Sequence, residues 1–341
     1  MIGTTPHVRP RVVTQALIGA AVGALSGALL LTLLVGSGVA RAAAPGLSAE
    51  VVDGTLQIQG GPASERIALR VSPLDANQLL IDLGNDGSAE QSFALVSFGA
   101  IALDAGNGDD VVLIDGAFTA GKPTTIAGGN GNDTLFGGSG GETFDGGLGN
   151  DVADGNGGSD TALMGSGDDT FIWDPGDGSD RFEGGRGSDT MVFNGAAGNE
   201  VMAASANGSR VRFTRVQGTI VMDLDGVEGI DVRALAGTDA ITIGDVGGTD
   251  LQRVDLDLAT TLADSRSDGV ADTVTVLGTN LVDTIRASAL GADVEVSGLA
   301  AIVRVLHADP ESDTLVLDSL EGADDVSVED DVNDLILVDV K

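Results

Sequence analysis

A nine-residue repeat between Gly128 and Val192 constrains this chain more than any other feature. The clearest copy runs from Gly128 to Phe136 and follows the pattern G-G-x-G-x-D-x-U-x, in which U is a large apolar residue. The seven copies begin at Gly128, Gly137, Gly146, Gly155, Met164, Pro175 and Gly184, and an outlying copy begins at Ala105. A two-residue insertion, Trp173 and Asp174, shifts the phase after the fifth copy. One copy cannot bury its apolar residue alone, so the copies must stack.

Each copy carries an acid in its sixth place and an apolar residue in its eighth. The acids are Asp133, Glu142, Asp151, Asp160, Asp169, Asp180 and Asp189, with Asp110 in the outlying copy. The apolar residues are Leu135, Phe144, Ala153, Ala162, Phe171, Phe182 and Met191, and we expect them to face a core. Glycines before each acid allow a tight backbone whose carbonyl oxygens point inward. Carboxylate and carbonyl oxygens in a cramped loop suit Ca²⁺, which takes 6 to 8 oxygen ligands.

These repeats resemble the RTX, or hemolysin-type, calcium-binding repeats, which form a parallel β-roll. In that family two nonapeptides make one turn, and calcium lies between loops on the same side, 18 residues apart. The resemblance implies one side with Asp133, Asp151, Asp169 and Asp189, and another with Glu142, Asp160 and Asp180. It therefore implies up to five calcium sites, of which the gaps Asp133/Asp151 and Asp151/Asp169 keep the pattern best.

The predicted metal ligands are loop glycines, through their carbonyl oxygens, and the sixth-place acids. The set is Gly129, Gly131, Asp133, Gly138, Gly140, Glu142, Gly147, Gly149, Asp151, Gly157, Asp160, Gly165, Gly167, Asp169, Gly176, Gly178, Asp180, Gly185, Gly187 and Asp189. Asn156 replaces the second glycine of its repeat, and Glu142 is one methylene longer than the other acids.

Composition excludes some partners and favours calcium. The chain has 17 Lys and Arg against 52 Asp and Glu, a net charge of −35, so its surface repels nucleic acid and anionic lipid. Because 42 % of residues are hydrophobic, a disordered acidic chain is not expected. Cysteine is absent, so neither disulfides nor thiolate ligands are available.

The N-terminus predicts export. Arg9 and Arg11 precede an uncharged stretch from Val12 to Ala40, followed by the cleavage pattern Ala40-Arg41-Ala42. We therefore expect residues 1–42 to be a signal peptide and the protein to be secreted, extracellular or bound to the cell surface. The apolar stretch is also long enough to span a bilayer, so an uncleaved membrane anchor stays open as the alternative.

The rest of the chain predicts strands and turns, so the fold is expected to be all-β. Residues 43–104 are expected to form a strand-rich cap, residues 105–193 the calcium-binding β-roll, and residues 194–341 a degenerate β-solenoid. In the last region an acid is followed by alternating apolar residues at Asp239, Asp272, Asp283, Asp313 and Asp325. A separate β-sandwich is the alternative for 194–341, since strands at this spacing fit it too.

Catalysis is not expected. His307 remains alone after cleavage, so neither an H-E-x-x-H zinc site nor a Ser-His-Asp relay is available. Aromatic residues make up 3 % of the chain, too few for sugar platforms, and Trp173 at the insertion is expected to plug the stack. The favoured function is a non-enzymatic calcium-binding protein with a structural or adhesive role, whose partner is a cell-surface or extracellular glycan or protein. The alternative is a carbohydrate-active enzyme, or its accessory module of the alginate-modifying type, with its groove on the 194–341 face.

Overall fold

Two 14-stranded β-sheets make up the fold in the computed structural model, which describes residues 46–115, 121–262 and 266–341. Among these residues the helical segments are three short 3₁₀ turns, η1 (Leu95–Ser97), η2 (Gln217–Thr219) and η3 (Asp330–Asp334). The all-β prediction is therefore confirmed. No helix in these ranges is long and apolar enough to cross a membrane. The predicted signal peptide or anchor, residues 1–42, lies outside the described residues.

From β6 to β15 successive strands of the chain alternate between the two sheets. The first sheet runs β1 (Ser48–Val52), β2 (Thr55–Gln59), β6 (Ala100–Asn107), β8 (Thr124–Asn130), β10 (Glu142–Leu148), β12 (Thr161–Ser166), β14 (Arg181–Arg186), β18 (Ile220–Asp225), β17 (Arg210–Arg215), β16 (Val201–Asn207), β20 (Ala240–Ile243), β22 (Thr273–Leu277), β26 (Thr314–Asp318) and β28 (Leu337–Val340). The second runs β27 (Asp325–Val328), β23 (Thr284–Leu290), β24 (Asp293–Ser297), β25 (Ile302–Leu306), β21 (Arg253–Asp257), β19 (Gly229–Arg233), β15 (Thr190–Asn194), β13 (Thr170–Trp173), β11 (Val152–Asp154), β9 (Thr134–Phe136), β7 (Val111–Ile114), β3 (Arg66–Val71), β4 (Gln78–Leu83) and β5 (Gln91–Ala94).

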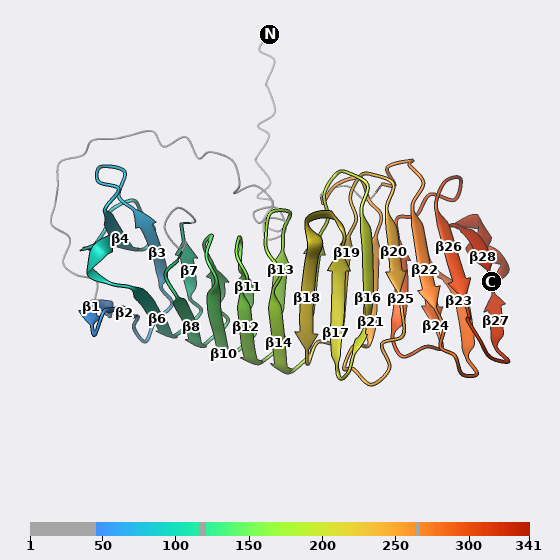
Figure 1. Ribbon diagram of the computed structural model, residues 1–341, viewed down its shortest axis with the longest axis horizontal. Coiled ribbons are helices and arrows are strands. Elements are labelled where there is room, and N and C mark those ends of the chain that lie inside the picture. Colours follow the sequence, from blue (N-terminus) through green and yellow to red (C-terminus); the bar gives the residue numbers. More distant parts are fainter. Residues whose placement is uncertain (1–45, 116–120, 263–265) are drawn as a thin grey trace, which may run out of the picture. The chain divides into compact units, whose positions relative to one another are not determined.

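Successive repeats alternate between the two sheets, so two nonapeptides make one turn, as the resemblance implies. Phe144 of β10 pairs in parallel register with Ala162 of β12, 18 residues later. In the second sheet Ala153 pairs with Phe171 at the same interval. The eighth-place residues of both sheets are fully buried and share one hydrophobic core. The stacked parallel turns can be followed from β6 to β15 in Figure 1.

The N-terminal strands cover the first edge of both sheets. β1 pairs antiparallel with β2, and β4 lies antiparallel between β3 and β5. β2 and β3 then pair in parallel with β6 and β7, where the repeating turns begin. Antiparallel hairpins therefore close the edge that the first turn would otherwise expose.

The C-terminal half continues the solenoid. β16, β20, β22, β26 and β28 pair in parallel in the first sheet, and β15, β19, β21 and β25 do so in the second. Two antiparallel hairpins interrupt this order: β17 lies between β18 and β16, and β24 lies between β25 and β23. The strands still alternate between the sheets on both sides of the hairpins, so the structure favours the solenoid over the β-sandwich.

Candidate metal centre

The sixth-place acids lie at the start of each short strand, and their side chains are buried. None of the seven is more than 4 % exposed. Burying an ionised carboxylate is costly unless hydrogen bonds or a cation compensate for the lost water. The hydrogen-bond partners of these carboxylates therefore decide whether a cation could bind there.

Asp110, Asp133, Asp151, Asp169 and Asp189 form a hydrogen-bonded ladder, here called the first row. The backbone N–H of Asp133 donates to Asp151 Oδ1 at 2.8 Å, and that of Asp151 donates to Asp169 Oδ1 at 2.8 Å. The same bond joins Asp110 to Asp133 at 2.7 Å and Asp169 to Asp189 at 2.9 Å. Each carboxylate therefore uses one oxygen to bind the turn before it.

Glu142, Asp160 and Asp180 form the second row. The Glu142 N–H donates to Asp160 Oδ1 at 2.6 Å, and the Asp160 N–H donates to Asp180 Oδ1 at 2.8 Å. The longer side chain of Glu142 folds back on its own loop, where Glu142 Oε2 accepts the Gly138 N–H at 2.9 Å. The two rows thus match the two sides that the resemblance implies.

The second oxygen of every carboxylate in both rows is buried and has no hydrogen-bond partner among the described residues. These atoms are Oδ2 of Asp110, Asp133, Asp151, Asp160, Asp169, Asp180 and Asp189, and Oε1 of Glu142. So regular a set of unpaired anionic oxygens is not expected in a stable core, because each costs desolvation energy. A bound cation is the partner that their charge requires.

Backbone carbonyls lie beside these oxygens. A methyl group added to Gly146 would be 2.6 Å from Asp151 Oδ2 and 2.5 Å from the Met164 carbonyl oxygen of the next turn. At Gly128 it would meet Asp133 Oδ2 and, at 2.8 Å, the Gly146 carbonyl oxygen. Four of the first-place glycines thus leave a space lined by a carboxylate and a carbonyl of the next turn: Gly128, Gly137, Gly146 and Gly184. Oxygen donors of these two kinds fit Ca²⁺.

Within the described residues no three His, Asp or Glu side chains converge on one point. An ion shell at these rows would therefore have to combine one or two carboxylates with carbonyl oxygens from stacked turns. First-place carbonyls, such as those of Gly146 and Met164, were missing from the sequence-based ligand set. The glycine at the first place of five of the seven copies was the signal that could have indicated them.

Burial raises the pKa of the row acids. The pKa of Asp151 rises to about 7, mainly through loss of water, and the Asp169 and Asp133 carboxylates raise it further. The pKa of Asp160 rises to about 8 for the same reasons, with Asp180 and Glu142 as the charged neighbours. The Asp133 and Glu142 N–H groups respectively lower these two pKa values. A cation would favour the charged form and reverse the shifts.

The second- and fourth-place glycines of the first row allow turns to approach each other. Gly147 and Gly149 have φ of 103° and 126°, and a Cβ on either would overlap the carbonyl oxygen of Gly129 or Gly131 in the preceding turn. Only glycine fits at these positions. Their role in the structure is close stacking, and the predicted coordination through their carbonyls stays a prediction.

In the copy that begins at Gly155, the tightly stacked glycine differs from the predicted ligand Gly157. Gly158, and not Gly157, holds the fourth place of its repeat, with φ of 145° and no room for a Cβ against the Gly140 carbonyl oxygen. Gly178 stacks on Gly158 in the same way. A Cβ on Gly157 would make only ordinary contacts, at 3.7 Å or more. Because Asn156 replaces the second-place glycine, the pattern indicated Gly157 as the loop glycine that Gly158 provides.

Contrary to the expectation, Trp173 does not plug the stack but lies within it. It ends β13 as a fully buried core residue, stacked on Phe193 with ring centroids 4.1 Å apart and an interplanar angle of 2°. Its indole N–H donates to the Gly178 carbonyl at 2.8 Å. The two extra residues lengthen the strand and its loop without breaking the stack, and Phe171 still pairs with Met191.

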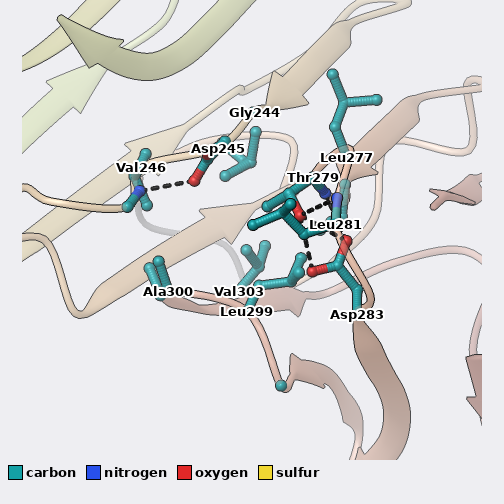
Figure 2. A pocket seen from close by; sticks show the side chains of 15 residues that line it. Gly244, Asp245, Val246, Leu277, Thr279, Leu281, Asp283, Leu299, Ala300 and Val303 are labelled. Carbon is teal, nitrogen blue, oxygen red and sulfur yellow. Dashed lines mark hydrogen bonds between the residues drawn. The ribbon is translucent and has the colours of Figure 1, made fainter. Parts of the chain in front are cut away.

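A separate cavity of about 320 Å³ lies in the C-terminal half, shown in Figure 2. Its lining is mostly apolar and includes Leu277, Leu281 and Val303. Its acids are engaged in their own loops, because Asp283 accepts the Thr279 N–H at 2.6 Å and Asp245 accepts the Gly247 N–H at 2.7 Å. Both acids of the cavity thus fix the loops that carry them.

Comparison with known proteins agrees with the geometry of the rows. The family model described as the RTX calcium-binding nonapeptide repeat matches in four copies over residues 124–153, 136–171 and 175–206. A search of curated proteins found no match to the chain. The chain thus carries RTX repeats, and Ca²⁺ is the ion that such repeats bind.

Proposed function

We propose that this chain is a secreted or surface-associated calcium-binding protein whose solenoid serves as a structural or adhesive module. The observation that carries the proposal is the set of buried carboxylate oxygens that have no protein partner and lie beside carbonyls of the next turn. Calcium would satisfy these oxygens and join successive turns, so the ion would be part of the fold.

Export is supported by the N-terminal sequence. The apolar stretch ends in Ala40-Arg41-Ala42, which has the small residues that signal cleavage requires. Calcium-binding modules that work outside cells typically have dissociation constants of about 10⁻⁴ to 10⁻³ M. Repeats that fold only at such concentrations would stay unfolded until the chain meets the external medium.

A non-catalytic role is supported by the condition of the groups that a carbohydrate-active enzyme would use. Trp173 is buried and offers no platform for a sugar ring. His307 Nδ1 lies 2.7 Å from Asp257 Oδ1, so the imidazole already has a partner. Arg210 pairs with Glu183, Asp223 and Asp225 of its own sheet, so its charge is already neutralised there.

The test is isothermal titration of the full chain with calcium chloride, followed by a glycan array probed in calcium and N-terminal sequencing of protein from the culture medium. We expect several calcium ions per chain, a mature N-terminus at Ala43 and surface binding without turnover. Cleavage of polysaccharides by the pure protein would support the enzyme alternative. An intact chain in the membrane fraction would support the anchor.

A further inference from the structure

A third row of buried acids lies outside the nonapeptide repeats, in the C-terminal half. Glu200, Asp239, Asp272 and Asp313 directly precede β16, β20, β22 and β26, which are parallel neighbours in the first sheet. Each of these side chains is at most 2 % exposed. The sequence predicted that Asp239, Asp272 and Asp313 precede strands, and it indicated no ion site at any of the four acids.

The third row repeats the ladder of the first. The Glu200 N–H donates to Asp239 Oδ1 at 2.7 Å, the Asp239 N–H to Asp272 Oδ1 at 2.8 Å, and the Asp272 N–H to Asp313 Oδ1 at 3.0 Å. The direction is the same as in the repeats, since each amide donates to the acid of the following turn. Successive acids of this row are 33 to 41 residues apart in the sequence. The ladder therefore forms without the nine-residue repeat.

The two ends of the third row are compensated within the protein. Glu200 pairs with the Arg215 guanidinium and also accepts the Ala196 N–H at 2.9 Å. Asp313 Oδ2 accepts the Asp309 N–H at 2.7 Å. The Arg215 guanidinium neutralises Glu200 at one end of the row, and the Asp309 N–H satisfies Asp313 Oδ2 at the other.

The two middle acids are different. Oδ2 of Asp239 and Oδ2 of Asp272 are buried and have no hydrogen-bond partner among the described residues, as in the RTX rows. Asp268 Oδ2 accepts the Gly237 N–H at 2.9 Å, which brings a further carboxylate to the loop that leads into Asp239. The negative charges of Asp268 and of the other row acids raise the pKa of Asp239 and Asp272, and burial raises it most, to about 7 for each.

A carbonyl of the next turn lies beside the first acid of this row. A Cβ on Gly195 would meet Glu200 Oε2 and, at 2.8 Å, the Ala234 carbonyl oxygen, the same relation that Gly146 has to Asp151 and Met164. Gly195 and Ala234 each lie five residues before the row acid of their turn. Ser267 and Ala308 hold the corresponding positions, five residues before Asp272 and Asp313.

We propose that Asp239 and Asp272 each bind a calcium ion together with carbonyls of the next turn, and that Asp268 adds negative charge to this pair of sites. The proposal extends calcium binding beyond the RTX repeats and rests on the proposed function for the identity of the ion. In the loop from Ser267 to Asp272 the repeat's glycines at places one, two and four are missing, which is why the motif does not extend here. Arg215 takes the place of an ion at the boundary between the two halves.

The experiment is equilibrium dialysis of the full chain against calcium chloride, with the bound ions counted for wild type, Asp239→Asn/Asp272→Asn and Asp313→Asn. Asparagine keeps the Oδ1 acceptor of the ladder and removes the charge at the unpaired oxygen. We expect the double variant to bind two fewer calcium ions than wild type. Asp313→Asn is the matched control, because its second oxygen is already bonded, and it should keep the wild-type count.

Thermal unfolding followed by circular dichroism provides the second measurement. Without calcium the double variant should melt at or above the wild-type temperature, because the substitutions remove repulsion between buried carboxylates. Calcium should raise the melting temperature of the double variant less than that of wild type. If the folded double variant binds as many ions as wild type, or Asp313→Asn loses as many, the sites are wrong. A wild type that binds no calcium would contradict the proposed function itself. If the double variant does not fold, Asp268→Asn, at a half-buried position, should weaken calcium binding, and unchanged binding would overturn the proposal.

Discussion

At the scale of single residues, each carboxylate of the rows has a separate task for each oxygen. Asp151 Oδ1 accepts the Asp133 N–H, and its Oδ2 has no hydrogen-bond partner among the described residues. The hydrogen bond at Oδ1 depends on the shape of the side chain, whereas binding of a cation at Oδ2 would depend on its charge. Substitutions that keep the shape therefore separate calcium binding from stacking.

Asp151→Asn should keep the ladder and lose the ion. We expect calcium affinity to fall by at least about tenfold, since second-shell changes alone cost 10–100-fold. Asp250→Asn, an exposed acid outside the rows, removes the same charge and should change affinity only through weak screening. Isothermal titration at matched ionic strength checks both. Equal losses would mean that total acidity, and not loop geometry, governs calcium uptake.

The raised pKa values of the rows predict opposite effects of pH on stability and on calcium affinity. Because burial raises the pKa of Asp151 to about 7 and of Asp160 to about 8, the folded calcium-free chain binds protons more tightly than the unfolded chain. The stability that these protons contribute is present at low pH and is lost as the pH rises to about 7 to 8. Calcium binds the deprotonated acids, so its affinity should fall below about pH 7.

Melting of the chelated protein and calcium titration, each at several values between about pH 5.5 and 8.5, measure the two effects. Asp160→Asn should reduce the pH dependence of the calcium-free melting temperature. A dependence that is unchanged in this variant would assign the effect to the overall charge of −35 instead.

At the scale of elements, the strands of the roll are only three to eight residues long, and the stacking of their loops holds them in register. The glycines of the first row let the carbonyl of one turn touch the Cα of the next. The aromatic stack of Trp173, Phe193 and Phe213 then connects the roll to the C-terminal half, with ring centroids 4.1 and 4.6 Å apart. Backbone contact and aromatic packing thus replace long strands.

Gly149→Ala should destabilise the calcium-bound protein by about 2 kcal/mol or more beyond the effect of Gly176→Ala. The two glycines have φ of 126° and 125°, so the conformational strain of a side chain is the same. A Cβ on Gly149 overlaps the Gly131 carbonyl oxygen, whereas nothing lies within 4 Å of one on Gly176. Urea unfolding of both variants gives the difference. Equal losses would show that strain, and not stacking, sets the requirement for glycine.

At the scale of the whole molecule, negative charge and fold oppose each other. The net charge is −35, and the rows gather buried carboxylates along the first sheet and the second. A site at 100-fold ligand excess contributes about 2.7 kcal/mol of stability if the unfolded chain does not bind, so a few sites decide the equilibrium. Calcium concentration is thus expected to control folding.

Chelation should unfold residues 128–192. Trp173 is the only tryptophan and is fully buried, so its fluorescence should shift to longer wavelength as the β signal of the far-ultraviolet spectrum falls. Calcium should restore both signals. Magnesium at equal concentration should not, because it demands a smaller, strictly octahedral shell. Unchanged spectra after chelation would contradict the linkage of folding to calcium.

The sequence by itself determined the repeating part of the fold and the acids of its rows. A strict period of nine, with one acid and one apolar residue per copy, allows neighbouring turns to match only when like positions stack. The observed pairing of Phe144 with Ala162 follows from that period. Gly158 was not predicted as the fourth-place glycine of its copy, because Asn156 breaks the glycine pattern two residues earlier.

Only the tertiary structure decided the hairpins β16–β17–β18 and β23–β24–β25, and only it revealed the third row. Alternating apolar residues look the same in parallel and antiparallel strands, so the open edge available to each strand sets its partner. Asp239, Asp272 and Asp313 are 33 and 41 residues apart, so no constant interval marks them as a row in the sequence. Their acids were recognisable as a row only once folding had stacked them, buried them and left Asp239 and Asp272 each with one unpaired oxygen.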